Sequence, residues 1–243
     1  MFPVAIAVGL CVAMLATGVA ANGDGSMKQD SANGQRILFL GNSITLHSPA
    51  PDIGWIGNWG MAASAEEHDY VHILLQRLTV KSGGVAPCSE VGNIADFERA
   101  YSTSDIQAIF AKYAAFKPNI VIIAIGENVS PLVTDDSKAQ FKGAIARMLA
   151  IVKTDATTAL YVRSSFWPDP AKDAILRQAC LDAGETFVDI SALAGNEENS
   201  ARSTHQFQNP GVAAHPGDKG MLAIADAIWA AMLAREAAQS QPK

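Results

Sequence analysis

The chain has 243 residues, of which 49% are hydrophobic, and it carries a formal net charge of −6. This length and apolar content suffice for one sizeable buried core, so we expect a single folded domain. An acidic chain without a basic stripe is a poor match for a phosphate backbone, which excludes nucleic acid as the expected partner.

The first 21 residues are almost wholly apolar, carry no charged side chain and end in the small residues Thr17-Gly18-Val19-Ala20-Ala21. This pattern predicts a signal peptide over residues 1–21 and a secreted or periplasmic protein that has no membrane association after cleavage. The alternative is an uncleaved N-terminal membrane anchor, because about 18 to 20 apolar residues can span a bilayer. Residues 22–35 are rich in Gly, Ser and Asp and are expected to form a disordered lead.

From residue 36 onward, short apolar runs alternate with amphipathic stretches, which predicts strands and helices in turn. Strands are expected at 36–40, 83–93, 119–125, 158–162 and 186–190, and helices at 65–78, 105–116, 137–153, 171–183 and 218–235. This alternation is typical of a parallel sheet with helices on both faces. We therefore predict an α/β fold over residues 36–236, a three-layer α/β/α sandwich around about five parallel strands, followed by a short tail at 237–243.

The stretch Gly41-Asn42-Ser43-Ile44-Thr45 follows directly on the first apolar run. Small residues let the backbone turn sharply there, so we expect Ser43 at the carboxyl edge of the sheet, where open α/β proteins bind ligands. Taken alone, this stretch favours the alternative that Ser43 is only the N-cap of a following helix. His215 stands in a turn just before the last predicted helix, and it could meet Ser43 across one domain.

Four short blocks resemble those of the SGNH (GDSL-like) hydrolases, in the family's order, from residue 36 to about residue 234. They are Gly41-Asn42-Ser43-Ile44-Thr45, Gly92, Gly126-Glu127-Asn128 and His215-Pro216. The resemblance implies a flavodoxin-like α/β fold and a serine nucleophile that acts on esters. No cofactor and no metal is expected.

The residues of these blocks suggest how an ester would be cleaved. A serine hydroxyl is a weak nucleophile at neutral pH and needs a base within hydrogen-bond reach, for which His215 is the candidate. The resemblance implies an oxyanion hole made of the backbone N–H groups of Ser43 and Gly92 and the side-chain amide of Asn128. Gly60 is the alternative to Gly92. Asn128 also begins a glycosylation motif, but its place at the end of a buried strand favours the oxyanion role.

The sequence departs from the family pattern beside the histidine. Val212 stands three residues before His215, where the family's triad Asp normally lies. Our first expectation is that a main-chain carbonyl in the 208–212 turn orients His215, which gives a Ser-His dyad. Asp218 is expected to cap the last helix, and Glu127 is a second carboxylate that could take the role. Asn42 and Val129 also stand where the family has Asp, without consequence for the chemistry.

Four further side chains are predicted to contact substrate, namely Trp55, Trp59, Arg163 and Trp167. Core packing is the alternative for the tryptophans of the 48–64 loop, and a surface ion pair is the alternative for Arg163. His68 and His72 have the spacing of two metal ligands, but no third ligand is evident. Cys88 and Cys180 could form a disulfide or remain two buried thiols.

Together these features predict a secreted serine esterase that acts through an acyl-enzyme on O-acetyl or other short acyl groups of a carbohydrate. The alternatives are a lipase or thioesterase-like acyl hydrolase, and a catalytically weakened carbohydrate-binding protein of the same fold. The expected partner is a small-molecule or polysaccharide ester. The sequence leaves the oligomeric state open.

Overall fold

The computed structural model describes residues 34–240, and five parallel strands form a sheet at their centre. These strands are β1 (Arg36–Gly41), β2 (Cys88–Asn93), β3 (Ile120–Ala124), β4 (Ala159–Arg163) and β5 (Thr186–Val188). Their order across the sheet is β2-β1-β3-β4-β5. Strand β2 therefore lies on one side of β1, and the three later strands lie on the other side. This sheet confirms the predicted α/β fold. The predicted signal peptide and most of the predicted lead fall on residues 1–33, outside the described residues.

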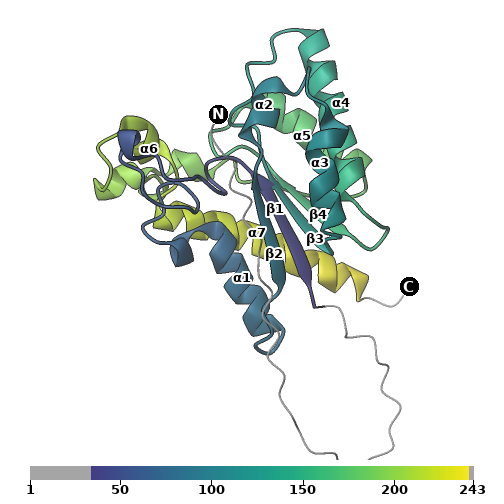
Figure 1. Cartoon of the computed structure of the whole chain (residues 1–243), viewed down its shortest axis with the longest axis horizontal. Helices are drawn as coiled ribbons and strands as arrows, with labels where there is room; N and C mark the ends of the chain where they lie inside the picture. Colours follow the sequence, from purple (N-terminus) through teal and green to yellow (C-terminus); the bar gives the residue numbers. More distant parts are fainter. Residues whose placement is uncertain (1–33, 241–243) are drawn as a thin grey trace, which may run out of the picture. The chain divides into compact units, whose positions relative to one another are not determined.

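Helices cover both faces of the sheet (Figure 1). One face carries α2 (Ala95–Ala100), α3 (Ile106–Ala115), α4 (Asp135–Val152) and α5 (Pro170–Asp182), and the other carries α1 (Tyr70–Lys81) and α7 (Asp218–Gln239). A short helix, α6 (Pro210–Ala214), and 3₁₀ turns at Pro51–Ile53, Glu66–His68, Leu193–Gly195, Glu197–Asn199 and Ala201–Thr204 complete the described elements.

The central strands are apolar throughout because both of their faces are covered. In β1, Leu38 and Leu40 pack into the cluster under α3 and α4, while Ile37 and Phe39 pack against α1 and α7. Successive side chains of a strand point to opposite faces, so a strand buried on both sides reads as an unbroken apolar run. This explains why β1 and β3 are the clearest strands in the sequence.

Some helices differ from expectation. Helix α1 begins at Tyr70 instead of residue 65, because the Asp69 carboxylate caps it and accepts a hydrogen bond from the amide of His72 at 2.8 Å. The short helices α2 and α6 were not predicted at all. Helix α7 continues to Gln239, a few residues beyond the expected end.

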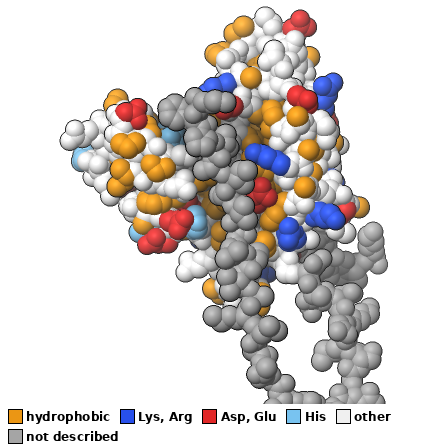
Figure 2. Space-filling view, in the orientation of Figure 1, with side chains coloured by type: hydrophobic (Ala, Val, Ile, Leu, Met, Phe, Trp, Pro, Cys, Tyr) orange, Lys and Arg blue, Asp and Glu red, His pale blue; other side chains and the backbone are white. Residues whose placement is uncertain are grey.

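The surface of the described part mixes charges of both signs. Figure 2 shows Lys and Arg side chains interspersed with Asp, Glu and apolar ones on the face that it draws. Within residues 34–240, none of the helices combines the length and the apolar character that crossing a bilayer demands.

Candidate active site

Ser43 lies just past the carboxyl end of β1, at the start of a tight turn. The amides of Thr45 and Leu46 both donate to the carbonyl of Asn42, at 2.9 and 3.0 Å. The turn needs glycine at position 41, because a Cβ there would lie 1.9 Å from Thr45 Oγ1 and 2.8 Å from the carbonyl oxygen of Ala124. The amide of Met61 donates to the carbonyl of Ser43 at 2.8 Å, which fixes the backbone of the serine.

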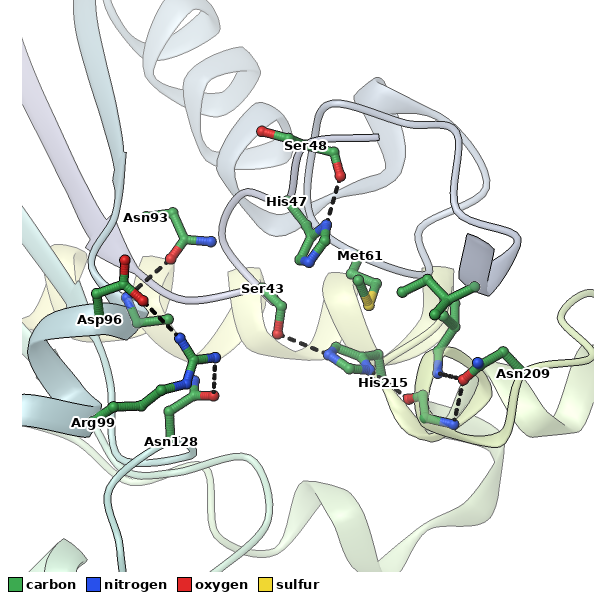
Figure 3. A pocket seen from close by; sticks show the side chains of 14 residues that line it. Ser43, His47, Ser48, Met61, Asn93, Asp96, Arg99, Asn128, Asn209 and His215 are labelled. Atoms are coloured by element: carbon green, nitrogen blue, oxygen red, sulfur yellow. Dashed lines mark hydrogen bonds and ion pairs between the residues drawn. The ribbon is translucent and has the colours of Figure 1, made fainter. Parts of the chain in front are cut away.

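His215 reaches Ser43 from the far end of the chain. Its Nε2 lies 2.8 Å from Ser43 Oγ, so the structure brings together the two residues that were predicted to meet (Figure 3). The residue is partly buried, and the ring of Trp167 packs against the imidazole edge-on, with 5.2 Å between ring centroids. The contact spans the sheet edge from β1 to the segment before α7.

The other ring nitrogen of His215 bonds to a main-chain carbonyl. His215 Nδ1 lies 2.8 Å from the carbonyl oxygen of Gly211, inside the 208–212 turn. This carbonyl lies in α6, and the amide of His215, which follows the helix, donates to Val212 O at 3.0 Å. The last carbonyls of a helix are common acceptors for side chains, and here the Gly211 oxygen bonds to the imidazole.

The Gly211 carbonyl also selects the tautomer of the histidine. A carbonyl oxygen only accepts hydrogen bonds, so Nδ1 must carry the proton that it donates. In the neutral ring, Nε2 is then an acceptor, and Ser43 Oγ–H donates to it. This is the arrangement that a general base for the serine requires.

The surroundings of His215 keep its ring neutral. Burial lowers the pKa of His215, and this effect outweighs the Gly211 hydrogen bond and the negative charge of Glu127, which both raise it. The imidazole is therefore unprotonated, and able to accept a proton, at neutral pH and somewhat below.

Val212 explains why no aspartate orients the histidine. Its side chain is buried in an apolar cluster with Trp55, Met61, Ala62 and Ala201. A carboxylate at this position would be desolvated among these apolar side chains. Asn209 supports the alternative arrangement, because its side chain caps α6 by accepting from the amides of Gly211 and Val212, at 2.9 and 3.1 Å.

The two other carboxylates considered for His215 are engaged elsewhere. Asp218 accepts from the amide and the hydroxyl of Ser64, at 2.8 and 2.6 Å. It does not cap α7 as expected, because Gly217 is the N-cap and Asp218 is the first residue of the helix. Glu127 is buried and pairs with Arg163, whose Nη1 lies 2.6 Å from Glu127 Oε1.

Two of the predicted oxyanion donors remain available at the pocket. No acceptor within residues 34–240 lies within hydrogen-bond reach of the Ser43 amide, and Asn128 lines the pocket beside Ser43. The Asn128 amide is held on both sides, since Nδ2 donates to Glu98 Oε2 at 2.9 Å and Oδ1 accepts from Arg99 Nη2 at 3.0 Å.

The prediction that Gly92 supplies a third donor is wrong in this structure. Gly92 lies inside β2, opposite Leu40, and it does not line the pocket. The amides of Cys88, which begins β2, and of Ile94, which follows it, donate to the carbonyls of Gln35 and Gly41. Amides two residues apart in a parallel ladder point the same way. The Gly92 amide therefore faces β1. The alternative, Gly60, is also engaged, because its amide donates to Asp69 Oδ2 at 2.9 Å.

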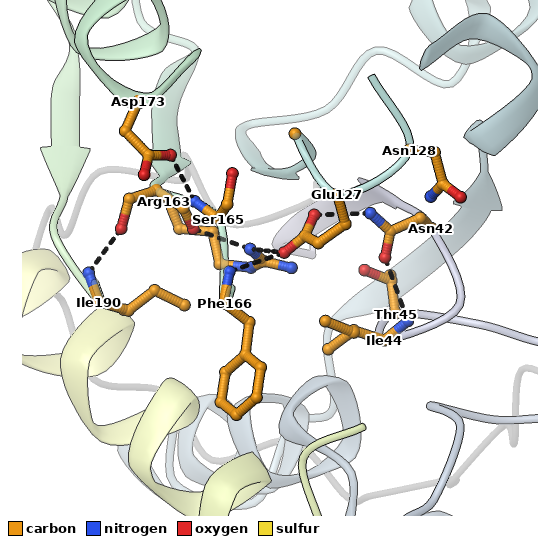
Figure 4. A network of polar contacts seen from close by, with 12 residues as sticks. Asn42, Ile44, Thr45, Glu127, Asn128, Arg163, Ser165, Phe166, Asp173 and Ile190 are labelled. Carbon is orange, nitrogen blue, oxygen red and sulfur yellow. Dashed lines mark hydrogen bonds and ion pairs between the residues drawn. The ribbon is translucent and has the colours of Figure 1, made fainter. Parts of the chain in front are cut away.

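A buried polar network supports the turn that carries Ser43 (Figure 4). Asn42 Nδ2 donates to Glu127 Oε2 at 2.7 Å and to Glu98 Oε1 at 3.4 Å, so one amide bridges two carboxylates. Burial alone would raise the pKa of Glu127, but Arg163 and the Phe166 amide lower it below its usual range. Burial and the charge of Glu127 raise the pKa of Glu98.

This network corrects the prediction for Arg163. The residue is fully buried and pairs with Glu127, so it neither contacts a substrate nor forms a surface ion pair. An aspartate at position 42 would add a third carboxylate to the pair formed by Glu98 and Glu127. The asparagine at this position instead supplies two donors.

The two tryptophans of the 48–64 loop also differ from the predicted role. Trp55 is only 2% exposed and packs edge-on against Trp59, with ring centroids 5.6 Å apart. Their indole N–H groups donate to the carbonyls of His47 and Ala63. Both therefore act in packing, which was the alternative. Trp167 is 37% exposed beside His215 and remains a candidate for substrate contact.

The pocket around Ser43 has a volume of about 540 Å³ and a largely polar lining (Figure 3). Besides the predicted residues, the lining includes His47, Ser48, Asn93, Asp96, Arg99 and Asn209. None of these side chains was predicted to be part of the site, although Asn209 lies in the 208–212 turn that was expected beside His215. For two of them, the sequence contains a pattern that indicates the start of a helix. Asn209 followed by Pro210 is a typical helix start, and Asn93 followed by Asp96 and Glu98 resembles one.

The remaining sequence features stay outside the site. Among residues 34–240, no group of three or more His, Cys, Asp or Glu side chains is arranged to hold a metal. His68 and His72 instead bond to Ser64 and Asp69. Cys180 is a buried free thiol, and burial raises its pKa to about 12.

Comparisons with known proteins agree with this fold. No protein-family model and no curated protein matches the chain. Among solved structures, LAE5, an alpha/beta hydrolase enzyme from the metagenome of Lake Arreo, Spain, is 18% identical, with a TM-score of 0.50 over 82% of this chain and 95% of that chain. At this identity, the match supports the fold alone.

Two further solved structures cover similar shares of the chain at slightly lower similarity. A putative GDSL-like lipase from Bacteroides ovatus is 15% identical, with a TM-score of 0.49 over 84% of this chain and 99% of that one. A carbohydrate esterase family 3 protein from Talaromyces cellulolyticus is 15% identical, with a TM-score of 0.46 over 82% and 96%.

The pKa values of His215 and His72 should be shifted in opposite directions from the usual value of a histidine. Burial lowers the pKa of His72 as well, but the hydrogen bond and charge of Asp69 outweigh it and raise the value overall. In an NMR titration, we expect His215 to titrate below about 6.5 and His72 above it. Spectra of His72→Asn and His215→Asn would assign the signals. A His215 value above that of His72 would contradict the neutral base.

Proposed function

We propose that the protein is a serine esterase that cleaves carboxylic esters through an acyl-enzyme. The observation that carries this proposal is the chain of contacts from Ser43 Oγ to His215 Nε2, and from His215 Nδ1 to the Gly211 carbonyl, each 2.8 Å long. A nucleophile, a base and an orienting acceptor are thus in line, which is the geometry that nucleophilic catalysis by serine requires.

In the first half-reaction, Ser43 Oγ attacks the ester carbonyl and its proton passes to His215 Nε2. The carbonyl oxygen becomes an oxyanion that accepts from the Ser43 amide and from Asn128 Nδ2. The intermediate then collapses to an acyl-serine, and the leaving alcohol takes the proton from His215. In the second half-reaction, water gives its proton to His215 and attacks the acyl-serine, and Ser43 leaves with a proton returned by the imidazole.

The polar lining of the pocket favours a hydrophilic substrate with a short acyl group. Only a few apolar side chains, among them Ile53, Met61 and Val212, line the pocket with Ser43. A long acyl chain needs an extended apolar groove to leave water. We therefore favour an O-acetyl or other short acyl ester of a carbohydrate over the substrate of a lipase or thioesterase-like hydrolase.

A second cavity, of about 590 Å³, adjoins Trp167 and offers room for the sugar part of such a substrate. Its lining combines the exposed Trp167 with polar side chains, among them Glu197, Arg202 and Ser203. An aromatic face beside convergent polar groups suits a sugar ring, which has apolar faces and hydroxyl edges. Because Trp167 also contacts His215, a sugar bound there would lie near the reacting ester.

One observation favours a second candidate, a carbohydrate-binding protein with weak turnover. The carbonyl of Gly211 carries no full charge, so it stabilises the imidazolium less than a triad aspartate would, and loss of that aspartate typically costs about 10⁴ in rate.

Secretion or a periplasmic location, as residues 1–21 suggest, is part of the main proposal.

Ser43→Ala should abolish hydrolysis of p-nitrophenyl acetate, with a loss of about 10⁴-fold or more in kcat, because the nucleophile is gone. The melting temperature should hold, since this hydroxyl contributes to chemistry and not to packing. Ser89→Ala, an exposed serine in β2, is the matched control and should retain full activity. Unchanged turnover in Ser43→Ala would refute the proposed mechanism, and absence of turnover in the wild type would favour the binding protein.

Trp167→Ala should raise KM for an acetylated xylo-oligosaccharide about tenfold, which corresponds to about 1.4 kcal/mol of lost contact. The effect on p-nitrophenyl acetate should be much smaller, because this ester has no sugar to lose. Trp167→Phe keeps an aromatic face and should restore most of the affinity. Equal losses on both esters would mean that Trp167 supports His215 and binds no sugar.

A further inference from the structure

The amide of Asn128 lies between two side chains of opposite charge, both from helix α2. Glu98 faces the nitrogen end, with 2.9 Å between Nδ2 and Oε2, and Arg99 faces the oxygen end, with 3.0 Å between Nη2 and Oδ1. Neither residue belongs to the blocks that indicated the site in the sequence.

The Glu98 carboxylate binds the backbone of the loop that carries Asn128. Its side chain is fully buried, and Oε1 accepts from the amides of Gly126 and Asn128, at 2.6 and 3.3 Å. The same oxygen lies 3.4 Å from Asn42 Nδ2, in the residue that precedes Ser43. One carboxylate thus joins the loop after β3 to the turn that carries the nucleophile.

Arg99 is held in place from the other side. Its Nη1 donates to Asp96 Oδ1 at 3.0 Å, while Nη2 reaches Asn128, and all three residues line the pocket (Figure 3). A donor on the carbonyl oxygen of an amide polarises the group and strengthens its N–H donors.

These contacts determine which way the amide points. Turning it by 180° would set Oδ1 against the Glu98 carboxylate and Nδ2 against the Arg99 guanidinium, so two attractive contacts would become two repulsive ones. The observed orientation commits one proton of Nδ2 to Glu98. The second proton is left for a group bound in the pocket.

We propose that Glu98 and Arg99 are positioning residues that hold the Asn128 amide with its free N–H toward the oxyanion. This inference rests on the proposed esterase function. In this view, α2 holds the Asn128 amide in the orientation that the oxyanion needs. A donor that is already in place stabilises the oxyanion without the cost of reorienting during the reaction.

The test uses Arg99→Met, because Arg99 is exposed enough to be replaced without unfolding. We expect kcat for p-nitrophenyl acetate to fall about tenfold with KM within about twofold, a fraction of the 10² to 10³ that loss of the donor itself costs. The double variant Arg99→Met/Asn128→Ala should be no slower than Asn128→Ala alone, because Arg99 acts through Asn128. Arg77→Met, which breaks a surface pair between α1 and α7, is the control and should leave kcat unchanged.

Arg99→Lys keeps a cationic donor and should recover part of the loss. Additive effects in the double variant, or a rise in KM with unchanged kcat, would overturn the inference in favour of direct substrate binding by Arg99. Ser43→Ala, measured in parallel, separates this failure from failure of the esterase proposal itself.

A second measurement does not depend on turnover. In ¹H–¹⁵N spectra, the side-chain amide of Asn128, assigned by its loss in Asn128→Ala, should give one pair of signals in the wild type. Arg99→Met and Glu98→Gln should shift or broaden this pair, because the amide then samples both orientations. Melting curves show whether Glu98→Gln remains folded. An unchanged pair of signals in folded Arg99→Met would overturn the inference.

Discussion

The hydrogen bond from His215 Nδ1 to the Gly211 carbonyl is the contact on which the candidate site depends. It fixes the tautomer, turns Nε2 toward Ser43 and replaces the charged acceptor of a triad with a neutral one. The bond forms because α6 is a five-residue helix that ends directly before His215, which places the imidazole beside a carbonyl of that helix. Asn209 caps that helix and Val212 packs it into the apolar cluster, so local helix geometry orients the imidazole. A charged acceptor would stabilise the imidazolium more strongly, while the carbonyl avoids placing a carboxylate in an apolar environment.

Behind the nucleophile, the protein tolerates two buried carboxylates by linking them to different partners. Glu127 pairs with Arg163, and Glu98 accepts from the backbone of the loop after β3. Asn42 lies between them and donates to both. Removing one member of a buried ion pair typically costs about 3 to 5 kcal/mol, because the remaining charge is left uncompensated. The network therefore links the Ser43 turn to the Asn128 loop, so both side chains meet the pocket from connected supports.

The sequence predicted the sheet and its longer helices because apolar runs and helical periodicity are local features. It predicted the Ser43–His215 pair because the short blocks that hold these residues resemble those of a known family. It also anticipated a carbonyl for His215, since the missing aspartate is visible at position 212. It did not predict the roles of Arg163, Trp55 and Trp59, because burial decides whether such a side chain meets a substrate or the core. The expectation for Gly92 was wrong because the direction of an amide depends on the phase of the strand ladder. Glu98 and Arg99 were missed because α2 is too short for a periodic signal, and because their partners are distant in the sequence.

The most direct test of the Ser-His dyad is the rate at which a fluorophosphonate modifies the protein, with the modified residue located by peptide mass spectrometry. This probe reports the reactivity of the nucleophile without a choice of ester substrate. We predict modification at Ser43, a rate in Asp218→Asn within a few-fold of the wild type, and a rate in His215→Ala lower by about 10³ or more. Modification at another residue, or a rate in Asp218→Asn that collapses to that of His215→Ala, would contradict a base oriented by the Gly211 carbonyl.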